Sequence, residues 1–522
     1  MAALILMMVA ATVLERLHGT EFALRWFYHN PVFIALWAVT AVCGLVWLVS
    51  RGMARRCFTF LLHAAFALIL AGALVTHLTG LSGEIHLRAG EPSSTVVLDD
   101  GSELSLPFSL RLEEFAVEHD EGSMMPSDYR SDLTVLPADE AYTISMNNIL
   151  KYGGYRFYQA DYDDDLEGSI LAVSHDPWGI GITYAGYLLL LVSMIGFFFE
   201  KDSNFRKVLR RVAGASLVLL VLLVPAQLNA QSMPGAAGEA LSADAVSASL
   251  SGAERLYEAI ARPRAPFMAS LAVGLVLFVV IGLWMARGRK PSRRLTTALS
   301  VLAGVLFVYL TLALGLRWYL SGHAPFAGTY SVMMLMAWLA SLTMLLLNRR
   351  FPLVYPLCFL LAGFTMLLAS RGDNYRITHM MPVLRSPLLS VHVMSMMMSY
   401  TLFGLAALNG VMGLALPSKK VKENLRDISL LILYPAVFLI TFGTFIGAVW
   451  ANISWGTYWA WDPKETWALI TLLVYAAALY GSTLKVFRNP VVFHIYTIAA
   501  FLSVLVTYFG VNLLLGGMHS YM

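Results

Sequence analysis

Charged residues and cysteines are scarce in this chain. Asp, Glu, Lys and Arg make up only 13% of its 522 residues, and the formal net charge of +3 is too small to indicate nucleic-acid binding. The chain has three cysteines, Cys43, Cys57 and Cys358, and no CxxC pair. Neither a disulfide framework nor a thiol-redox relay is therefore indicated. All three lie in or beside apolar runs, and we interpret them as small buried apolar residues.

Apolar residues are abundant instead. They make up 58% of the chain, and the mean hydropathy is +0.67. This composition is typical of a polytopic membrane protein and unlike that of a soluble enzyme. About thirteen apolar runs approach or reach the roughly 17 to 25 residues that span a bilayer as a helix. They cover residues 1–15, 31–50, 57–79, 179–199, 209–227, 267–286, 295–316, 329–347, 351–370, 388–416, 427–450, 467–485 and 490–515.

The basic loops predict how these helices are oriented. If the helices alternate, six basic segments fall on one face of the membrane, which the positive-inside rule assigns to the cytoplasm. We therefore predict a multi-pass protein of the bacterial cytoplasmic membrane, with the stretch 81–178 and the C-terminal tail outside. The six segments are 51–56, 206–211, 286–294, 348–350, 419–426 and 485–488.

The chain divides into two halves and a linker. We predict a first half over 1–205, an extra membrane helix and an outside linker over 206–265, and a second half over 266–522. The linker is rich in Ala, Ser and Gly. It follows a basic and then an apolar run, which also resembles a signal peptide and leaves cleavage near Ala230 open.

The outside stretch 81–178 has a different pattern from the rest of the chain. Its short alternating segments STVVL, LSLPFSLRL and YRFYQA are separated by DDG and YGG, which is typical of strands joined by turns. The predicted fold class is thus an α-helical polytopic membrane protein of about 13 helices. It carries a small β-rich extracytoplasmic domain.

Residues 455–467, WGTYWAWDPKETW, are the most informative segment. Aromatic and charged side chains together fit poorly in hydrocarbon, and Gly and Pro disfavour a continuous helix, so we predict a segment lying along the outer membrane surface. It suits a large flat ligand, although an interfacial aromatic belt is the alternative. For Asp462 and Glu465, two roles are open: accepting protons, or orienting this segment through hydrogen bonds. We favour the second. The tryptophans are Trp455, Trp459, Trp461 and Trp467.

The order of these residues resembles the WWD signature of the CcsA/ResC family of cytochrome c synthases, which handle haem. Further second-half segments match that family, namely 317–331, 382–400 and 509–522. Three first-half segments, 83–91, 147–163 and 176–191, are similar to the companion ResB (CcsB) family, although the domain is short for that family. The chain thus resembles a natural CcsBA fusion. The resemblance implies haem b as substrate, with indole rings stacked on the porphyrin and Lys464 paired with its propionates.

A haem site requires axial ligands to its iron. His392 lies about four residues into the outer end of its predicted helix, and His519 lies just past the outer end of the last one. Both can reach the Trp-rich segment, and two neutral imidazoles would make a six-coordinate site. A lone histidine at a helix end is more often structural. The resemblance assigns the external haem ligands to His392 and His519.

The resemblance also implies an inner haem position, with one histidine from each half. His63 matches the first of these, roughly 10 Å from the cytoplasmic end of its helix. Tyr480 stands where the family has the second, thirteen residues after Trp467. Three interpretations remain open: ligation by the Tyr480 phenolate, substitution by His494, or no stable inner site. For His494, a structural role in the core is an equal alternative.

The resemblance predicts a cytochrome c synthase of the lyase type. Haem would move to the outer face, where the thiols of the CxxCH motif of apocytochrome c add to its vinyl groups while the enzyme positions both partners. Thiol-reducing proteins are expected partners. One alternative is a haem transporter without ligation activity, and another is a polytopic scaffold that binds no haem. Only the ResB-like half favours ligation over transport.

Overall fold

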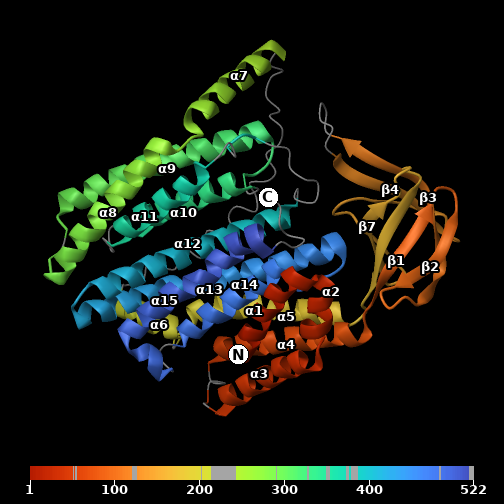
Figure 1. Ribbon diagram of the computed structural model, residues 1–522, viewed down its shortest axis with the longest axis horizontal. Coiled ribbons are helices and arrows are strands. Elements are labelled where there is room, and N and C mark those ends of the chain that lie inside the picture. Colours follow the sequence, from red (N-terminus) through yellow and green to blue (C-terminus); the bar gives the residue numbers. More distant parts are fainter. Residues whose placement is uncertain are drawn as a thin grey trace.

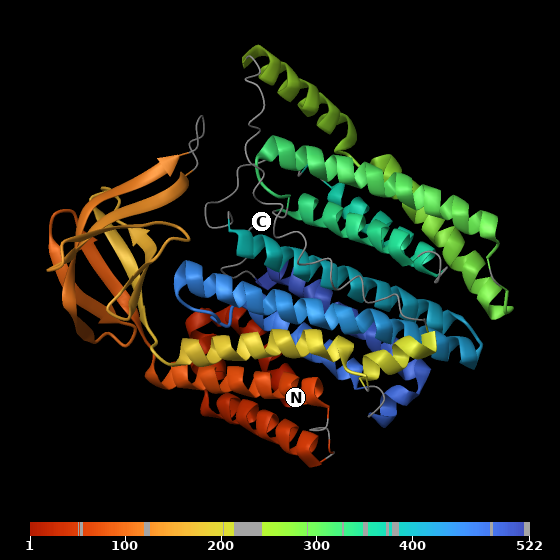
Figure 2. The same ribbon diagram turned by 180° about the vertical axis from the view of Figure 1, so that it is seen from behind.

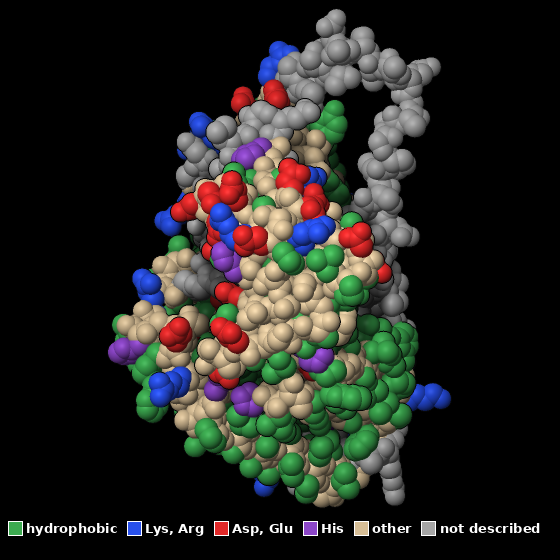
Figure 3. Space-filling model, turned by 90° about the vertical axis from the view of Figure 1, so that its right-hand side faces the viewer, with side chains coloured by type: hydrophobic (Ala, Val, Ile, Leu, Met, Phe, Trp, Pro, Cys, Tyr) green, Lys and Arg blue, Asp and Glu red, His purple; other side chains and the backbone are tan. Residues whose placement is uncertain are grey.

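The computed structural model describes residues 1–50, 52, 56–119, 126–201, 203–212, 243–289, 291–325, 328–347, 353–371, 375–377, 386–480 and 484–515. Within these ranges a bundle of long helices lies beside a separate antiparallel sheet (Figure 1). Charged side chains gather on the sheet domain, whereas hydrophobic side chains cover the helical part below it (Figure 3). This arrangement confirms the predicted fold class, a polytopic helical protein with a β-rich domain.

The first half contributes a group of helices at one side of the bundle. Helices α4 and α5 pack tightly because glycines lie at their contact: a Cβ at Gly72 would collide with Thr183, and one at Gly186 would collide with Ile69. Small residues let membrane helices approach closely in this way. The elements are α1 (Ala2–His18), α2 (Thr20–Ala23), the π-helical turn η1 (Leu24–Tyr28), α3 (Pro31–Ser50), α4 (Cys57–Thr79), α5 (Gly179–Phe199) and α6 (Asn204–Val212).

An eight-stranded antiparallel sheet is inserted between α4 and α5. Its strand order is β5-β4-β3-β2-β1-β8-β7-β6, and alternate side chains such as Ile85 and Leu87 are buried in its core. The predicted strand segments fall in β2, β3 and β7, which confirms the β-rich domain. The strands are β1 (Leu81–Arg88), β2 (Pro92–Leu98), β3 (Glu103–His119), β4 (Pro126–Leu136), β5 (Glu140–Ile144), β6 (Leu150–Tyr152), β7 (Tyr155–Tyr162) and β8 (Gly168–His175).

The second half forms the larger part of the bundle. Figure 2 shows α5 and α6 of the first half lying against α13, so the two halves share one helical core. The second half is preceded by α7 (Ala243–Ile260), which lies within the predicted linker. The elements that follow are α8 (Arg264–Ala286), α9 (Arg293–Ser321), α10 (Thr329–Leu347), α11 (Val354–Ala369), α12 (Pro387–Ala415), α13 (Lys419–Trp455), α14 (Pro463–Leu479), η6 (Lys485–Arg488), α15 (Pro490–Leu505) and the π-helix η7 (Val506–Leu515).

Nine spans within the described residues are long and apolar enough to cross a membrane. Three more of the predicted runs form α1, α11 and α14, which have only 16 or 17 residues each. The predicted run 209–227 lies outside the described residues from 213 onward. The described residues therefore account for twelve of the about thirteen predicted runs.

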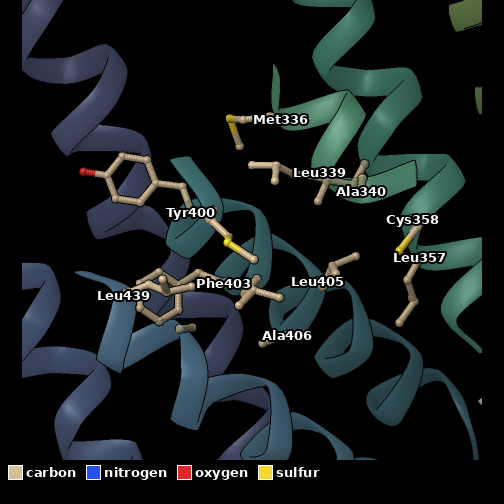
Figure 4. Packing of buried hydrophobic residues seen from close by; sticks show 14 of the residues in the cluster. Met336, Leu339, Ala340, Leu357, Cys358, Tyr400, Phe403, Leu405, Ala406 and Leu439 are labelled. Atoms are coloured by element: carbon tan, nitrogen blue, oxygen red, sulfur yellow. The ribbon is translucent and has the colours of Figure 1, made fainter. Parts of the chain in front are cut away.

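The main core lies where α10, α11, α12 and α13 meet (Figure 4). Cys358 is fully buried there among Leu357, Ala340 and Leu405, as predicted from its apolar surroundings. The prediction of burial is wrong for Cys43 and Cys57, whose side chains are exposed. Cys43 lies on the exposed surface of α3, and Cys57 is the first residue of α4. The prediction fails because an apolar residue of a membrane helix can face lipid as well as the protein core.

Candidate functional site

The Trp-rich segment 455–467 connects the end of α13 to the start of α14. Helix α13 ends at Trp455, and Gly456 follows in a left-handed conformation with φ of +85°. Asp462 caps α14 by accepting a hydrogen bond of 2.8 Å from the backbone N–H of Lys464, and Pro463 occupies the first turn. Glycine after a helix and Asp-Pro before one are preferred end signals. The predicted interruption of the helix is therefore present.

Hydrogen bonds within the segment fold it onto itself. Glu465 Oε2 accepts from the backbone N–H of Ala460 at 2.9 Å, and Thr466 Oγ1 donates to the carbonyl of Trp461 at 3.3 Å. Trp461 has a φ of +58°, a left-handed conformation that costs a non-glycine residue roughly 1–2 kcal/mol. Asp462 and Glu465 thus bind the backbone of the segment, the orienting role considered for them from the sequence.

Two of the four tryptophans are held by the first half. The ring of Trp461 stacks on Tyr28 with centroids 4.7 Å apart, and Phe33 meets it edge-on at 5.1 Å. Trp467 Nε1 donates a hydrogen bond to Thr12 Oγ1 at 3.1 Å. Tyr28 therefore covers one face of Trp461, so the four rings do not form one open shelf. Apart from the aromatic cluster of residues 26–28, no pattern in the sequence indicates these partners.

The other two tryptophans are associated with the end of α13. Trp455, its last residue, meets Trp450 edge-on at 4.8 Å, and Trp459 packs against the cluster formed by Tyr458, Ala448 and Ile180. The Nε1 donor of Trp459 is buried and has no hydrogen-bond partner among the described residues. The segment therefore turns back from the end of α13 to the level of Ala448 and brings a buried indole donor with it.

His392 lies against the same part of α13. Its Nδ1 donates a hydrogen bond of 2.7 Å to the carbonyl of Gly443, and a Cβ at Gly447 would lie only 2.5 Å from this nitrogen. Because a carbonyl only accepts, the proton of a neutral imidazole is on Nδ1 and the lone pair is on Nε2. This is the tautomer that metal-binding histidines commonly adopt. Gly447 is adjacent to Ala448, a member of the cluster against which Trp459 packs.

The second predicted outer ligand, His519, lies outside the described residues. Lys464, the predicted partner of the propionates, is hydrogen-bonded through Nζ to Asn512 Oδ1 at 2.8 Å. Asn512 belongs to the π-helix η7 and precedes His519 by seven residues. Such wide helices are rare and frequently occur at functional sites. Lys464 thus ties the Trp-rich segment to the part of the chain that leads to His519.

His63 and Tyr480 are both half-buried and are hydrogen-bonded to each other. His63 Nδ1 donates to the carbonyl of Thr59 at 2.7 Å, so Nε2 accepts a hydrogen bond from the hydroxyl of Tyr480. His494 is fully buried elsewhere: its Nε2 donates to the carbonyl of Lys422 at 3.0 Å, and its ring packs against Gly413. The structure therefore brings His63 to Tyr480 and gives His494 contacts of its own with α12 and α13.

Comparison with known proteins matches each half to a family. The model of the cytochrome C assembly protein family matches residues 326–519, and that of the ResB-like family matches residues 44–172. The cytochrome c biogenesis protein CcsA of Parasynechococcus marenigrum is 31% identical over 299 residues, which are 49% of this chain and 96% of that protein. CcsA of Guillardia theta is 32% identical over 248 residues, or 41% of this chain and 82% of that protein.

A longer relative spans both halves. Protein NrfI of Wolinella succinogenes is 25% identical over an alignment of 646 positions, gaps included, which covers 80% of this chain and 72% of that protein. The fold and these matches together define a multi-pass membrane protein that acts in cytochrome c maturation. The chain belongs to the cytochrome c assembly (CcsA) family and carries a ResB-like domain in the same polypeptide.

Proposed function

We propose that this protein is a cytochrome c synthase that carries haem b to the outer face of the bacterial cytoplasmic membrane and attaches it to apocytochrome c. The proposal rests above all on the placement of His392. Its ring is held by Gly443 in the tautomer that has the lone pair on Nε2. The same ring faces Gly447, which precedes Ala448 of the cluster against which Trp459 packs. An iron-ligating nitrogen and aromatic rings for a porphyrin face are thus close together.

The donor groups around this position suit haem as a substrate. The buried indole N–H of Trp459 lacks a partner among the described residues, and a propionate would satisfy it as a charge-assisted acceptor. Lys464 lies on the first turn of α14 and is hydrogen-bonded to Asn512. From this position its ammonium would pair with the second propionate of haem. We assign the iron to His392 and His519, in the six-coordinate arrangement that two imidazoles make.

Attachment needs little activation of the reacting groups by the enzyme. Each cysteine thiol of a CxxCH motif adds across a vinyl C=C bond: the sulfur bonds to one carbon, and the thiol proton ends on the other. No group leaves, and reduced thiols are needed, so thiol-reducing proteins are expected partners. The histidine of the motif replaces one of the two protein ligands on the iron. The share of the enzyme is to position haem and acceptor and to exclude water.

On its way to the outer face, haem is expected to bind more weakly at the inner position than at the outer one. Iron ligation by His63 requires breaking its hydrogen bond to Tyr480, and a neutral phenol is a poorer iron ligand than an imidazole. We propose that His63 and Tyr480 mark a transit position that holds haem only briefly. His494, whose Nε2 donates to the carbonyl of Lys422, has no role in this proposal.

The test is covalent attachment in a bacterial host that lacks its own maturation system. The chain is expressed with a CxxCH acceptor, and haem that stays on the acceptor after denaturation is measured. We expect covalent product with the wild type, strong loss with His392→Ala, and no loss with His18→Ala, an exposed histidine on α1. Haem bound by the chain without covalent product would support a transporter, and absence of haem would support a scaffold.

A further inference from the structure

The last turns of α13 are held from two opposite sides. Gly443 and Gly447 face His392 on α12, whereas Asn452 faces the first half of the chain. Asn452 lies nine positions after Gly443, and at 3.6 residues per turn these two residues point about 180° apart around the helix. A displacement of the helix at Asn452 therefore changes its contact with His392.

Asn452 is the centre of a buried hydrogen-bond network between the halves. Its side chain is fully buried, and Oδ1 accepts from Arg156 Nη1 at 2.8 Å and from the hydroxyl of Tyr184 at 2.9 Å. Its Nδ2 donates to the carbonyl of Gly456 at 3.1 Å, and its own carbonyl accepts from the hydroxyl of Tyr158 at 3.2 Å. Arg156 and Tyr158 belong to β7, so the sheet domain contacts the helix directly.

The same side of the chain is held at further points beyond Asn452. Ser454 Oγ donates to Asn147 Oδ1 of the sheet domain at 2.8 Å. The hydroxyl of Tyr458 donates to Thr76 Oγ1 at 2.6 Å. The hydroxyl of Thr76 in turn donates to Asp176 Oδ2 at 2.6 Å. The contacts with the first half therefore continue from the end of α13 into the Trp-rich segment.

We propose that Asn452 and Arg156 are positioning residues through which the sheet domain sets the haem site. By holding Asn452, Arg156 fixes α13 against His392 and so maintains the hydrogen bond from Nδ1 to Gly443. Hydrogen bonds to the second nitrogen of a metal-binding histidine orient the ring and tune its basicity. This inference rests on the proposed role of His392 as a haem ligand. It gives a physical reason why the first half of the chain would affect haem binding at His392, which belongs to the second half.

The experiment uses the full chain, purified in detergent, with haem content, visible spectrum, reduction potential and covalent product all measured. For Asn452→Ala we expect bound haem, an altered reduction potential, and a loss of covalent product of up to roughly 10- to 100-fold, the usual cost of losing the hydrogen bond behind a metal ligand. Arg156→Ala should change the potential and the product in the same direction. Asn452→Asp should restore both in part, because its carboxylate still accepts from Arg156 and Tyr184 but cannot donate to the carbonyl of Gly456.

Lys151 provides the matched control. It is an exposed cation on β6, directly opposite Arg156 in the sheet register, and Lys151→Ala should behave like wild type. If Asn452→Ala does not fold, Arg156→Ala decides the question: a potential and yield equal to those of Lys151→Ala would overturn the inference. A wild-type haem that His392→Ala leaves unchanged would instead refute the proposed function.

Discussion

Replacing Gly456 with alanine tests how tightly the Trp-rich segment is joined to the sheet domain. Gly456 ends α13 with a φ of +85°, and a Cβ there would lie 2.6 Å from ring atom Cε2 of Tyr158. The Tyr158 ring is only 1% exposed, so it has little room to move. The substitution therefore combines backbone strain with a collision against a buried ring.

The two effects can be estimated separately. A non-glycine residue in the left-handed region costs roughly 1–2 kcal/mol, and overpacking at a buried contact costs roughly 1–3 kcal/mol. Together they weaken the native junction by roughly 2–5 kcal/mol if the two add. At about 1.4 kcal/mol per factor of ten, the local equilibrium shifts by roughly thirty-fold to several thousand-fold.

Gly322 provides a control with the strain but without the collision. Its φ is +71°, and a Cβ there would meet nothing within 4 Å, so Gly322→Ala should cost only the roughly 1–2 kcal/mol of backbone strain. Thermal unfolding followed by tryptophan fluorescence, and the yield of covalent cytochrome c, compare the two variants. We expect Gly456→Ala to unfold at a lower temperature and to lose more product. Equal effects of the two substitutions would refute the reasoning.

Three further predictions concern other parts of the chain. Glu200 accepts two hydrogen bonds from the first turn of α4, so Glu200→Ala should cost about 1–2 kcal/mol of stability, which thermal unfolding measures; an unchanged midpoint contradicts this cap. Tyr480→His places an imidazole beside His63 and should raise the haem bound per chain, measured by the pyridine haemochrome assay; an unchanged ratio argues against an inner site. Arg88, by hydrogen bonding, holds the pKa of Asp163 below its usual value, so the contribution of the Arg88–Asp163 pair to stability is complete above a pH of about 4 and is lost as the pH falls further. Asp163→Asn should remove this acid-dependent step from the tyrosine fluorescence of the sheet domain.

The helices and the sheet domain were predictable because their signals are local. Apolar runs predict membrane helices, and alternating segments separated by DDG and YGG predict strands and turns. The ends of the Trp-rich segment were predictable for the same reason, since Gly456 and Pro463 interrupt helices in any context. The exposure of Cys43 was not, because hydropathy does not distinguish a side chain facing lipid from one facing the protein core.

The partners of the site residues were less predictable because they lie far away in the sequence. Nothing in the periodicity of residues 1–50 indicates that Tyr28 stacks on Trp461, or that Thr12 accepts from Trp467. Likewise, the resemblance placed Tyr480 where the family has the histidine that partners His63, but it left open whether Tyr480, His494 or neither takes that place. The hydrogen bond from Tyr480 to His63 depends on how α4 and α14 meet, which only the packed structure specifies.

Haem binding by the purified protein tests the central claim most directly. The full chain is expressed with ample haem, purified in detergent, and compared with the His392→Ala, His519→Ala double variant by haem stoichiometry and visible spectrum. We predict a low-spin, six-coordinate spectrum in the wild type that the double variant loses. A wild type without haem, or a double variant with an unchanged spectrum and stoichiometry, would contradict the account.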